Sequence, residues 1–256
     1  MTATGGPAIL KKNEVASVGD DAIRTIGTLR ETSLHAALKT WYARPGDELE
    51  ASVEGYQIDL RRGAQLIEIQ TRNFAALKRK LTQLVEFYPV RLVHPIAQEK
   101  WIVRLGRDGV TPLTRRKSPR RGRVDQLFAE LVSFPELVAH PNFTLEVLMT
   151  REEEILRPAG RSNGRRVSWR RKGWEICDRR LLGVIDQVVL ASPADFLRFL
   201  PDALPQPFTS RDLAVATGQS LYVVQKITYC LRKMGTIGSA GKRGGALLYT
   251  IPIRER

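Results

Sequence analysis

The sequence predicts an α/β fold, in which a mixed β-sheet is flanked by helices, followed by a small α+β domain near the C-terminus. Residues 48–71 contain three strand-like runs, and a helical stretch separates them from further runs that begin at Val90. A helix that connects strands acts as a crossover and allows a parallel pair. Two short helices and a Gly-rich hairpin within residues 207–251 predict the second domain.

The first helix is expected over residues 32–43, because apolar side chains recur there with helical spacing. Thr32 or Ser33 can cap its N-terminus, and Leu34 and Leu38 lie on one stripe. The three strands are expected within 48–54, 56–60 and 65–71, which alternate between apolar and polar residues.

The second helix is expected in the stretch "FAALKRKLTQLVEFY", with Asn73 as its cap and Pro89 as its end. Two short strands, "VRLVHPI" and "KWIVRL", are expected to follow. Farther along, "FTLEVLM" is expected to be a strand, "RRLLGVIDQVVLAS" a helix and "SPADFLRFLP" a helical turn. The expected organisation is a flexible tail at 1–27, an α/β domain at 28–113, a basic linker at 114–123, a middle α+β region of unclear class at 124–200, and the second domain at 201–256.

The charge of the chain indicates an acidic partner. The 256 residues carry a formal net charge of +14, and 43 % of them are hydrophobic, which is enough for a substantial core. Nucleic acid is the usual partner of so basic a protein; a ribosomal-type or membrane-surface protein is the alternative. The sequence shows neither an apolar run of about 18 residues nor a signal peptide. With only two cysteines, a cytoplasmic location is expected.

Acidic residues stand where strands are expected, in the stretch "GYQIDLRRGAQLIEIQT". Asp59 ends one run, and Glu68 and Gln70 are two positions apart in the next, so they point to the same face. Strand pairing would bring Asp59 beside Glu68. Two such carboxylates suit Mg²⁺, which can activate water and stabilise a phosphoryl transition state. The alternative is an ordinary solvated sheet face.

Residues 28–105 resemble the PD-(D/E)XK phosphodiesterase superfamily, which has the restriction-endonuclease-like fold. The order helix, three strands, helix, strand matches the core of that family. The resemblance implies that Asp59 and Glu68 bind Mg²⁺ or Mn²⁺. Gln70 stands where the family usually has lysine, and would position water or the scissile phosphate.

The same resemblance implies a cation and a further acid near the metal. Lys78 or Lys80, on the helix after the strands, could supply the missing cation from another position. Glu31 matches the glutamate that the family often carries on its first helix, with Glu50 as a weaker candidate. His35 is one turn from Glu31 and is interpreted as a structural residue.

The last 45 residues or so resemble the winged helix-turn-helix family, with a cap at Thr209 or Ser210, a turn at Gly218 and a Gly-rich basic hairpin. Such a domain lays its second helix in the major groove of DNA. The alternative is a protein-interaction module. The resemblance implies DNA contacts through the polar residues of that helix and of the hairpin: Ser220, Tyr222, Gln225, Lys226, Thr228, Tyr229, Arg232, Lys233, Lys242 and Arg243.

Two arginine-rich blocks, 115–123 and 161–172, add to the positive charge. In the second block the basic residues alternate with Trp169 and precede Trp174, a combination that favours a nucleic-acid surface. Solvated linkers, or tryptophans that pin a hairpin to the core, are the alternatives. The expected DNA-binding residues of this block are Arg165, Arg166, Arg170, Arg171 and Lys172.

Together these features predict a Mg²⁺-dependent DNA endonuclease with a nuclease-like core and a DNA-reading module, in a mobile-element or defence system. Duplex DNA is the expected partner, no membrane is involved, and an oligomer is compatible with the sequence. The alternative is a non-catalytic DNA-binding protein or transcriptional regulator with a degenerate nuclease-like domain. A protein that acts on RNA is a third possibility.

Overall fold

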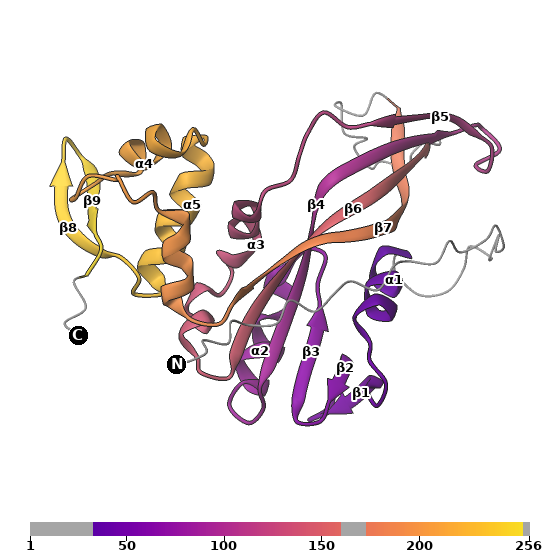
Figure 1. Cartoon of the computed structure of the whole chain (residues 1–256), viewed down its shortest axis with the longest axis horizontal. Coiled ribbons are helices and arrows are strands. Elements are labelled where there is room, and N and C mark those ends of the chain that lie inside the picture. Colours follow the sequence, from indigo (N-terminus) through magenta and orange to yellow (C-terminus); the bar gives the residue numbers. More distant parts are fainter. Residues whose placement is uncertain (1–32, 160–172, 253–256) are drawn as a thin grey trace, which may run out of the picture. The chain divides into compact units, whose positions relative to one another are not determined.

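A single mixed sheet organises most of the chain (Figure 1). The computed structural model describes residues 33–159 and 173–252, all within one compact unit that spans Glu31–Arg256. The expected tail, 1–27, lies outside the described residues. Strands follow the order β1-β2-β3-β4-β6-β7, and β5 pairs with β4. Their bounds are β1 Glu48–Val53, β2 Tyr56–Arg62, β3 Gln65–Ile69, β4 Val90–Leu105, β5 Pro112–Lys117, β6 Phe143–Pro158 and β7 Trp174–Leu190.

The sheet is mixed, as the sequence predicts. β1, β2 and β3 form an antiparallel meander, whereas β4 runs parallel to both β3 and β6. The chain reaches β4 from β3 through a short 3₁₀-helix, η1 (Phe74–Leu77), and α2 (Lys78–Leu84). This crossover produces the expected parallel pair.

Helices cover both faces of the sheet, because successive side chains along its strands point to opposite faces and pack into two separate apolar clusters. Leu66 belongs to one cluster and its neighbour Ile67 to the other. The cluster of Ile67 includes Leu34 and Leu38 of α1 (Ser33–Tyr42). The cluster of Leu66 takes in η1, α2, η2 (Val124–Leu127), α3 (Phe128–Leu131) and η3 (Pro135–Ala139).

Asn73 precedes η1 but does not cap it with its side chain as expected. It adopts the left-handed conformation, with φ 61°. The backbone N–H of Phe74 instead donates to Oε2 of Glu130 on α3, at 3.1 Å. A carboxylate distant in sequence therefore satisfies a donor at the start of this helix, which local propensity could not predict.

The prediction of a helix in "RRLLGVIDQVVLAS" was wrong, since these residues belong to β7. β7 pairs with β6 along nearly its whole length, from Leu145 opposite Leu190 to Pro158 opposite Trp174. The edge of β6 offers backbone donors and acceptors that only a strand can satisfy, and β-branched residues such as Val184 and Val188 favour that state. Pairing thus decides a pattern that local spacing left ambiguous.

The region 124–200 and the basic block 115–123 also differ from expectation. β6 and β7 complete the sheet of the expected N-terminal domain, so the sheet continues far beyond residue 113. Part of the expected linker is β5, which pairs with β4. The two short strands expected before it are the single strand β4, whose register to β6 shifts between Ala97 and Glu99.

After β7 the chain forms η5 (Pro193–Phe199), α4 (Ser210–Thr217), α5 (Leu221–Lys233), β8 (Gly238–Arg243) and β9 (Ala246–Thr250). The side chain of Thr209 accepts the N–H of Asp212, whose carboxylate accepts the Thr209 N–H, which forms a capping box. Gly218 ends α4 with φ 65°, a conformation that glycine adopts without strain. Ser220 caps α5.

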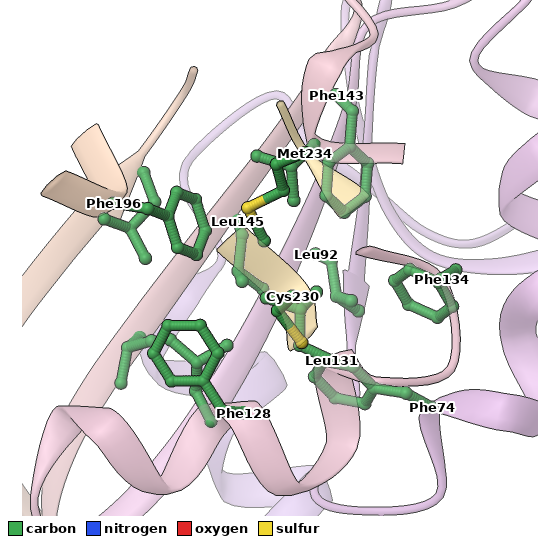
Figure 2. Close-up of a cluster of buried hydrophobic side chains, with 14 of the residues drawn as sticks. Phe74, Leu92, Phe128, Leu131, Phe134, Phe143, Leu145, Phe196, Cys230 and Met234 are labelled. Carbon is green, nitrogen blue, oxygen red and sulfur yellow. The ribbon is translucent and has the colours of Figure 1, made fainter. Parts of the chain in front are cut away.

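The buried face of α5 packs against the elements that cover the sheet. Cys230 and Met234 lie with Phe128, Leu131 and Phe196 in one continuous apolar cluster (Figure 2). The C-terminal helices and the sheet therefore share a core. Within the described residues, no helix is both long and apolar enough to cross a membrane.

Candidate functional site

The two carboxylates singled out in the sequence lie side by side where strand pairing is interrupted. The β1–β2 register runs from Ala51–Ile58 to Leu49–Leu60 and skips Glu50 and Asp59. Glu50 has φ 51°, which is uncommon for a residue other than glycine. Ile58 and Leu60 belong to different apolar clusters, although an undisturbed strand would put both on one face. The alternation of β2 side chains between the two faces of the sheet is therefore shifted at Asp59.

The pairing of β2 with β3 ends at Leu60 opposite Ile67, and Asp59 and Glu68 are the next residues beyond it on the two strands. Oδ2 of Asp59 accepts the backbone N–H of Ile69 at 2.7 Å. The backbone N–H of Asp59, in turn, stabilises the Glu68 carboxylate. The two residues are 9 % and 8 % exposed, so both carboxylates are largely removed from water.

Glu68 carries the most perturbed acid of the site. Burial, and to a smaller extent the nearby charge of Asp59, raise its pKa from 4.5 to about 7, against the opposing effect of Lys80. A carboxyl group with a pKa near neutrality is typical of sites that bind a cation or exchange a proton, although structural ion pairs also produce such shifts.

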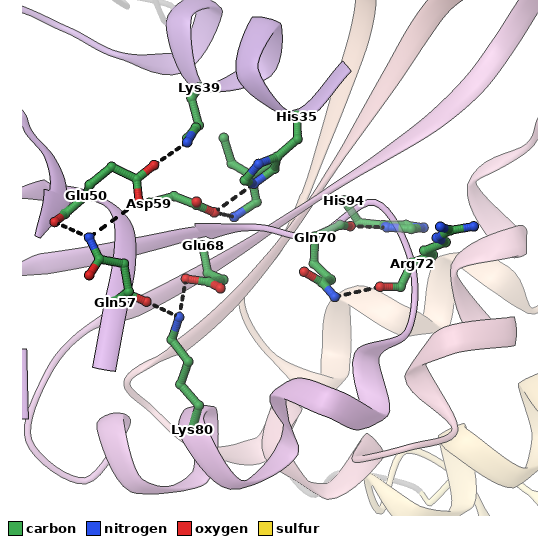
Figure 3. A network of polar contacts seen from close by, with 11 residues as sticks. His35, Lys39, Glu50, Gln57, Asp59, Glu68, Gln70, Arg72, Lys80 and His94 are labelled. Atoms are coloured by element: carbon green, nitrogen blue, oxygen red, sulfur yellow. Dashed lines mark hydrogen bonds and ion pairs between the residues drawn. The ribbon is translucent and has the colours of Figure 1, made fainter. Parts of the chain in front are cut away.

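Lys80 is the cation that reaches this pair. Its Nζ lies 2.7 Å from Oε2 of Glu68 and also donates to the backbone carbonyl of Gln57 (Figure 3). The sequence left Lys78 and Lys80 as alternatives. Lys78 begins α2 with its side chain exposed, and α2 directs Lys80, not Lys78, at Glu68.

Two side chains of α1, His35 and Lys39, contact acidic residues of the adjacent strands. Nε2 of His35 lies 3.1 Å from Oδ2 of Asp59, so His35 orients the Asp59 carboxylate. Lys39 forms an ion pair with Glu50, which the Gln57 side chain also contacts. The sequence did not reveal the His35–Asp59 contact, because the two residues are far apart in the chain. Glu31 lies outside the described residues.

Gln70 does not face the carboxylates. It follows the end of β3, and its Nε2 donates to the backbone carbonyl of Arg72 at 2.6 Å (Figure 3). The Gln70 backbone carbonyl accepts a hydrogen bond from Nδ1 of His94, at 2.7 Å. Burial lowers the pKa of His94, which keeps its imidazole neutral. The loop after β3 thus holds Gln70, and the expected contact with water or phosphate would need a different side-chain rotamer.

Within residues 33–159 and 173–252, no group of three or more His, Cys, Asp or Glu side chains is placed to hold a metal ion. The donor set of two carboxylates nevertheless fits Mg²⁺, which commonly uses one or two protein carboxylates and keeps several waters. Repulsion between Asp59 and Glu68 is part of what raises the pKa of Glu68, and a divalent cation would relieve it.

The expected DNA-binding residues of α5 separate into two groups. Gln225, Tyr229 and Arg232 line a hollow of about 870 Å³ together with Arg211 and Arg243, which we call the hairpin groove. Sequence reasoning missed Arg211, although its place at the start of α4 beside the expected cap was visible. Arg243 forms an ion pair with Asp212 at the same groove.

The other residues of this set face elsewhere. Tyr222 and Lys226 line a different cavity, beside β4. Lys233 forms an ion pair with Glu136 of η3, at 3.1 Å. Thr228, in contrast, does line the hairpin groove, but it is buried, with its hydroxyl 3.1 Å from that of Ser210, so it offers little surface there.

Ser220 and Lys242 remain exposed at the start of α5 and on β8. The basic residues Arg165, Arg166, Arg170, Arg171 and Lys172 lie outside the part of the chain that the structure describes.

A family model described as "Domain of unknown function (DUF8091)" matches residues 32–191. The chain belongs to this family. The DUF8091 domain begins one residue before α1 and ends one residue after β7, so it coincides with the sheet and the helices that cover it. It contains Asp59, Glu68 and Lys80, whereas α4, α5 and the β8–β9 hairpin lie outside it.

A relative of this DUF8091 chain, an uncharacterized protein of Treponema pallidum (strain Nichols), is 30 % identical over 226 residues. The alignment covers 88 % of this chain and 87 % of the relative. The similarity therefore extends over more of the chain than the family domain. No solved structure matches the chain.

Proposed function

We propose that this protein is a metal-dependent DNA endonuclease, with a catalytic α/β domain of the PD-(D/E)XK, restriction-endonuclease-like type. The observation that carries the proposal is the contact between Lys80 Nζ and Glu68 Oε2, at 2.7 Å, beside the buried carboxylate of Asp59. Two acids and a lysine thus meet at an interrupted strand pair. In this proposal Lys80 takes the place of the lysine that the superfamily usually carries where this chain has Gln70.

Asp59 and Glu68 would hold Mg²⁺ or Mn²⁺ in the proposed site. A bound Mg²⁺ would supply an activated water and would stabilise the charge of the phosphoryl transition state. His35 would orient Asp59 through the contact between Nε2 and Oδ2. Lys80 would favour the ionised form of Glu68 against the effect of burial, and would add positive charge where the phosphate becomes more negative.

The C-terminal elements support a DNA-reading role in the same proposal. We infer a winged helix-turn-helix domain over residues 207–251, with α5 as the recognition helix and the β8–β9 hairpin as the wing. The hairpin groove offers Arg211, Arg232 and Arg243 to phosphates, and Gln225 and Tyr229 to base edges. The proposed location is the cytoplasm, and a mobile-element or defence system is the proposed setting.

The decisive experiment is plasmid cleavage with Mg²⁺ or Mn²⁺. The native protein is compared with Asp59→Ala, Glu68→Ala and Lys80→Met, and with Glu86→Ala as a control that removes an exposed acid elsewhere. We expect metal-dependent nicking that all three site variants lose and the control retains. Nicking that persists in Glu68→Ala would place the chemistry elsewhere.

A second candidate is a non-catalytic DNA-binding protein or transcriptional regulator. The position of Gln70 favours it, because its amide is bound to the Arg72 carbonyl and the Glu68–Lys80 ion pair already satisfies the site. A regulator should bind duplex DNA equally well in EDTA and cut under no metal condition. Competition between duplex DNA and RNA in the same binding assay tests the third possibility, an RNA-acting protein.

A further inference from the structure

A second cavity is lined by residues of the sheet and by one end of α5. Its volume is about 470 Å³, within the range of about 300–1,000 Å³ that is usual for ligand pockets. Leu34, which precedes His35, and Thr71, which follows Gln70, form one side of it. We call it the sheet cavity; its other walls are residues 94–97 and Lys100 of β4, the segment 120–130, and Tyr222, Val223 and Lys226 of α5.

The basic segment that forms one wall is fixed against β4. The backbone N–H of Gly122 donates to the carbonyl of Ala97 at 3.0 Å. A Cβ at position 122 would lie 2.4 Å from that carbonyl oxygen, a distance that real Cβ atoms do not reach. This approach occurs where the register of β4 shifts, between Ala97 and Glu99. Glycine therefore holds Arg120 and Arg121 at the rim of the sheet cavity.

The acidic residues of the sheet cavity already have partners. Oδ2 of Asp125 accepts from Nε of Arg123 at 3.1 Å. Glu130 accepts the backbone N–H of Phe74.

Glu152, the third acid of the sheet cavity, accepts the hydroxyl of Thr150 at 2.7 Å. Burial raises the pKa of Glu152, which favours its neutral form. Glu130 keeps its charge, because the backbone N–H that it accepts is neutral. The cavity is nevertheless lined by five cations, Lys100, Arg120, Arg121, Arg179 and Lys226, against three acids, of which Asp125 is paired and Glu152 is buried.

Some of the cations of the sheet cavity are paired as well. Lys100 and Arg179 share the carboxylate of Glu154, with nitrogen–oxygen distances of 3.4 and 3.5 Å. Arg121 pairs with Glu99 at 3.0 Å.

Arg120 and Lys226, by contrast, have no ion-pair partner among residues 33–159 and 173–252. Lys226 Nζ instead lies 4.8 Å from the centroid of the Tyr222 ring. The sheet cavity thus carries positive charge that the described residues leave unbalanced, and its lining includes the first turns of the proposed recognition helix.

We propose that the sheet cavity binds one nucleotide unit, whose phosphate Arg120 and Lys226 hold. Phosphate suits two cations that lack carboxylate partners, and the exposed ring of Tyr222 offers a surface for a base or sugar. A strand bound along α5 would reach this cavity through Tyr222 and Lys226, which line it. The identity of the nucleotide as part of a substrate strand rests on the proposed function; a free nucleotide shares the same chemistry.

The test is a binding titration of the full chain in EDTA, so that no cleavage contributes. The probes are dAMP, inorganic phosphate and a short 5′-phosphorylated DNA single strand. The test variant is Arg120→Glu/Lys226→Glu, with Arg120→Gln/Lys226→Gln as a milder form. The control is Arg107→Glu, which reverses an exposed charge on the turn after β4. Far-UV circular dichroism checks that each variant is folded.

We expect both double variants to weaken binding by roughly tenfold or more, and the control to leave it unchanged. Loss of strand binding identifies a nucleotide of the substrate strand, whereas loss of dAMP binding alone identifies a free nucleotide. Equal affinities in the native protein and both double variants would overturn the inference. The two proposals can fail separately. If the protein binds nucleotide through Arg120 and Lys226 but cuts DNA under no condition, the endonuclease proposal is rejected and the nucleotide site stands. Glu68→Ala should keep nucleotide binding in either case.

Discussion

The difference in unfolding free energy between the Glu68→Gln variant and the native protein should depend strongly on pH. The pKa of Glu68 is about 7 in the folded protein and 4.5 in its ordinary state. Between these two values the folded protein binds a proton that the unfolded chain has released. Ionising Glu68 therefore costs stability as the pH rises from about 4.5 to 7, and the full cost remains above pH 7.

The size of the effect follows from this shift. One pKa unit corresponds to about 1.4 kcal/mol, so a shift from 4.5 to about 7 is worth roughly 3 kcal/mol, most of it between pH 5 and 8. Glu68→Gln keeps the shape of the side chain but cannot ionise. Relative to the native protein, the variant should therefore gain about 2 to 3 kcal/mol of stability between pH 5 and pH 8.

Urea unfolding at pH 5, 6, 7 and 8 measures this difference without reference to any activity. Glu86→Gln is the matched control, because it makes the same substitution at an exposed acid outside the site. A flat difference for Glu68→Gln over the same range refutes the reasoning and leaves Glu68 as an ordinary acid. If Asp59 and Glu68 bind Mg²⁺, adding the ion should stabilise the native protein more than the variant.

Three further variants test single contacts. Gly122→Ala should destabilise the fold by about 2 kcal/mol or more, because its Cβ meets the Ala97 carbonyl. Gly238→Ala, the control, has room for a Cβ and should change the melting temperature little. Equal melting temperatures for the two variants would contradict the predicted clash at position 122. Thr209→Ala removes the cap of α4 and should cost about 1 kcal/mol in chemical denaturation; an unchanged midpoint contradicts a stabilising cap. Lys80→Met removes the partner of Glu68, which can then take up a proton because its pKa is already about 7, so the cost should be about 1–3 kcal/mol, together with loss of cleavage. Lys80→Arg should keep part of both; full nicking by Lys80→Met rules out the proposed role.

The sequence predicted the first half of the sheet because its signals are local. Helical spacing at α1, strand alternation from β1 to β3 and the crossover helix before β4 each arise within a few residues. β7 was predicted as a helix because its apolar residues suit either state, and only the partner strand β6 decides between them. The break expected within β4 proved to be a register shift at Ala97–Glu99, where the strand continues.

The sequence predicts those parts of the candidate site that depend only on the order of the strands. Asp59 and Glu68 stand on consecutive strands, so pairing alone brings them together. The choice between Lys78 and Lys80 depends on how α2 is rotated about its axis against the sheet. The sequence does not specify that rotation, so either lysine could have faced Glu68. The hydrogen bond from Gln70 to the Arg72 carbonyl depends on the loop after β3, and no periodic pattern specifies such a loop.

The energetic cost of this site is an argument for its use. An acid whose pKa is raised to about 7 lowers the stability of the fold at neutral pH, and the strand pairing beside it is interrupted with Glu50 at φ 51°. Apolar side chains at the positions of Asp59 and Glu68 would avoid the cost of burying two carboxylates. Perturbed carboxyl groups combined with local backbone strain are found most often where a protein binds or reacts. A cation bound between Asp59 and Glu68 would recover part of that cost, and for this reason the stability gained on adding Mg²⁺ tests the site even if the natural substrate is absent.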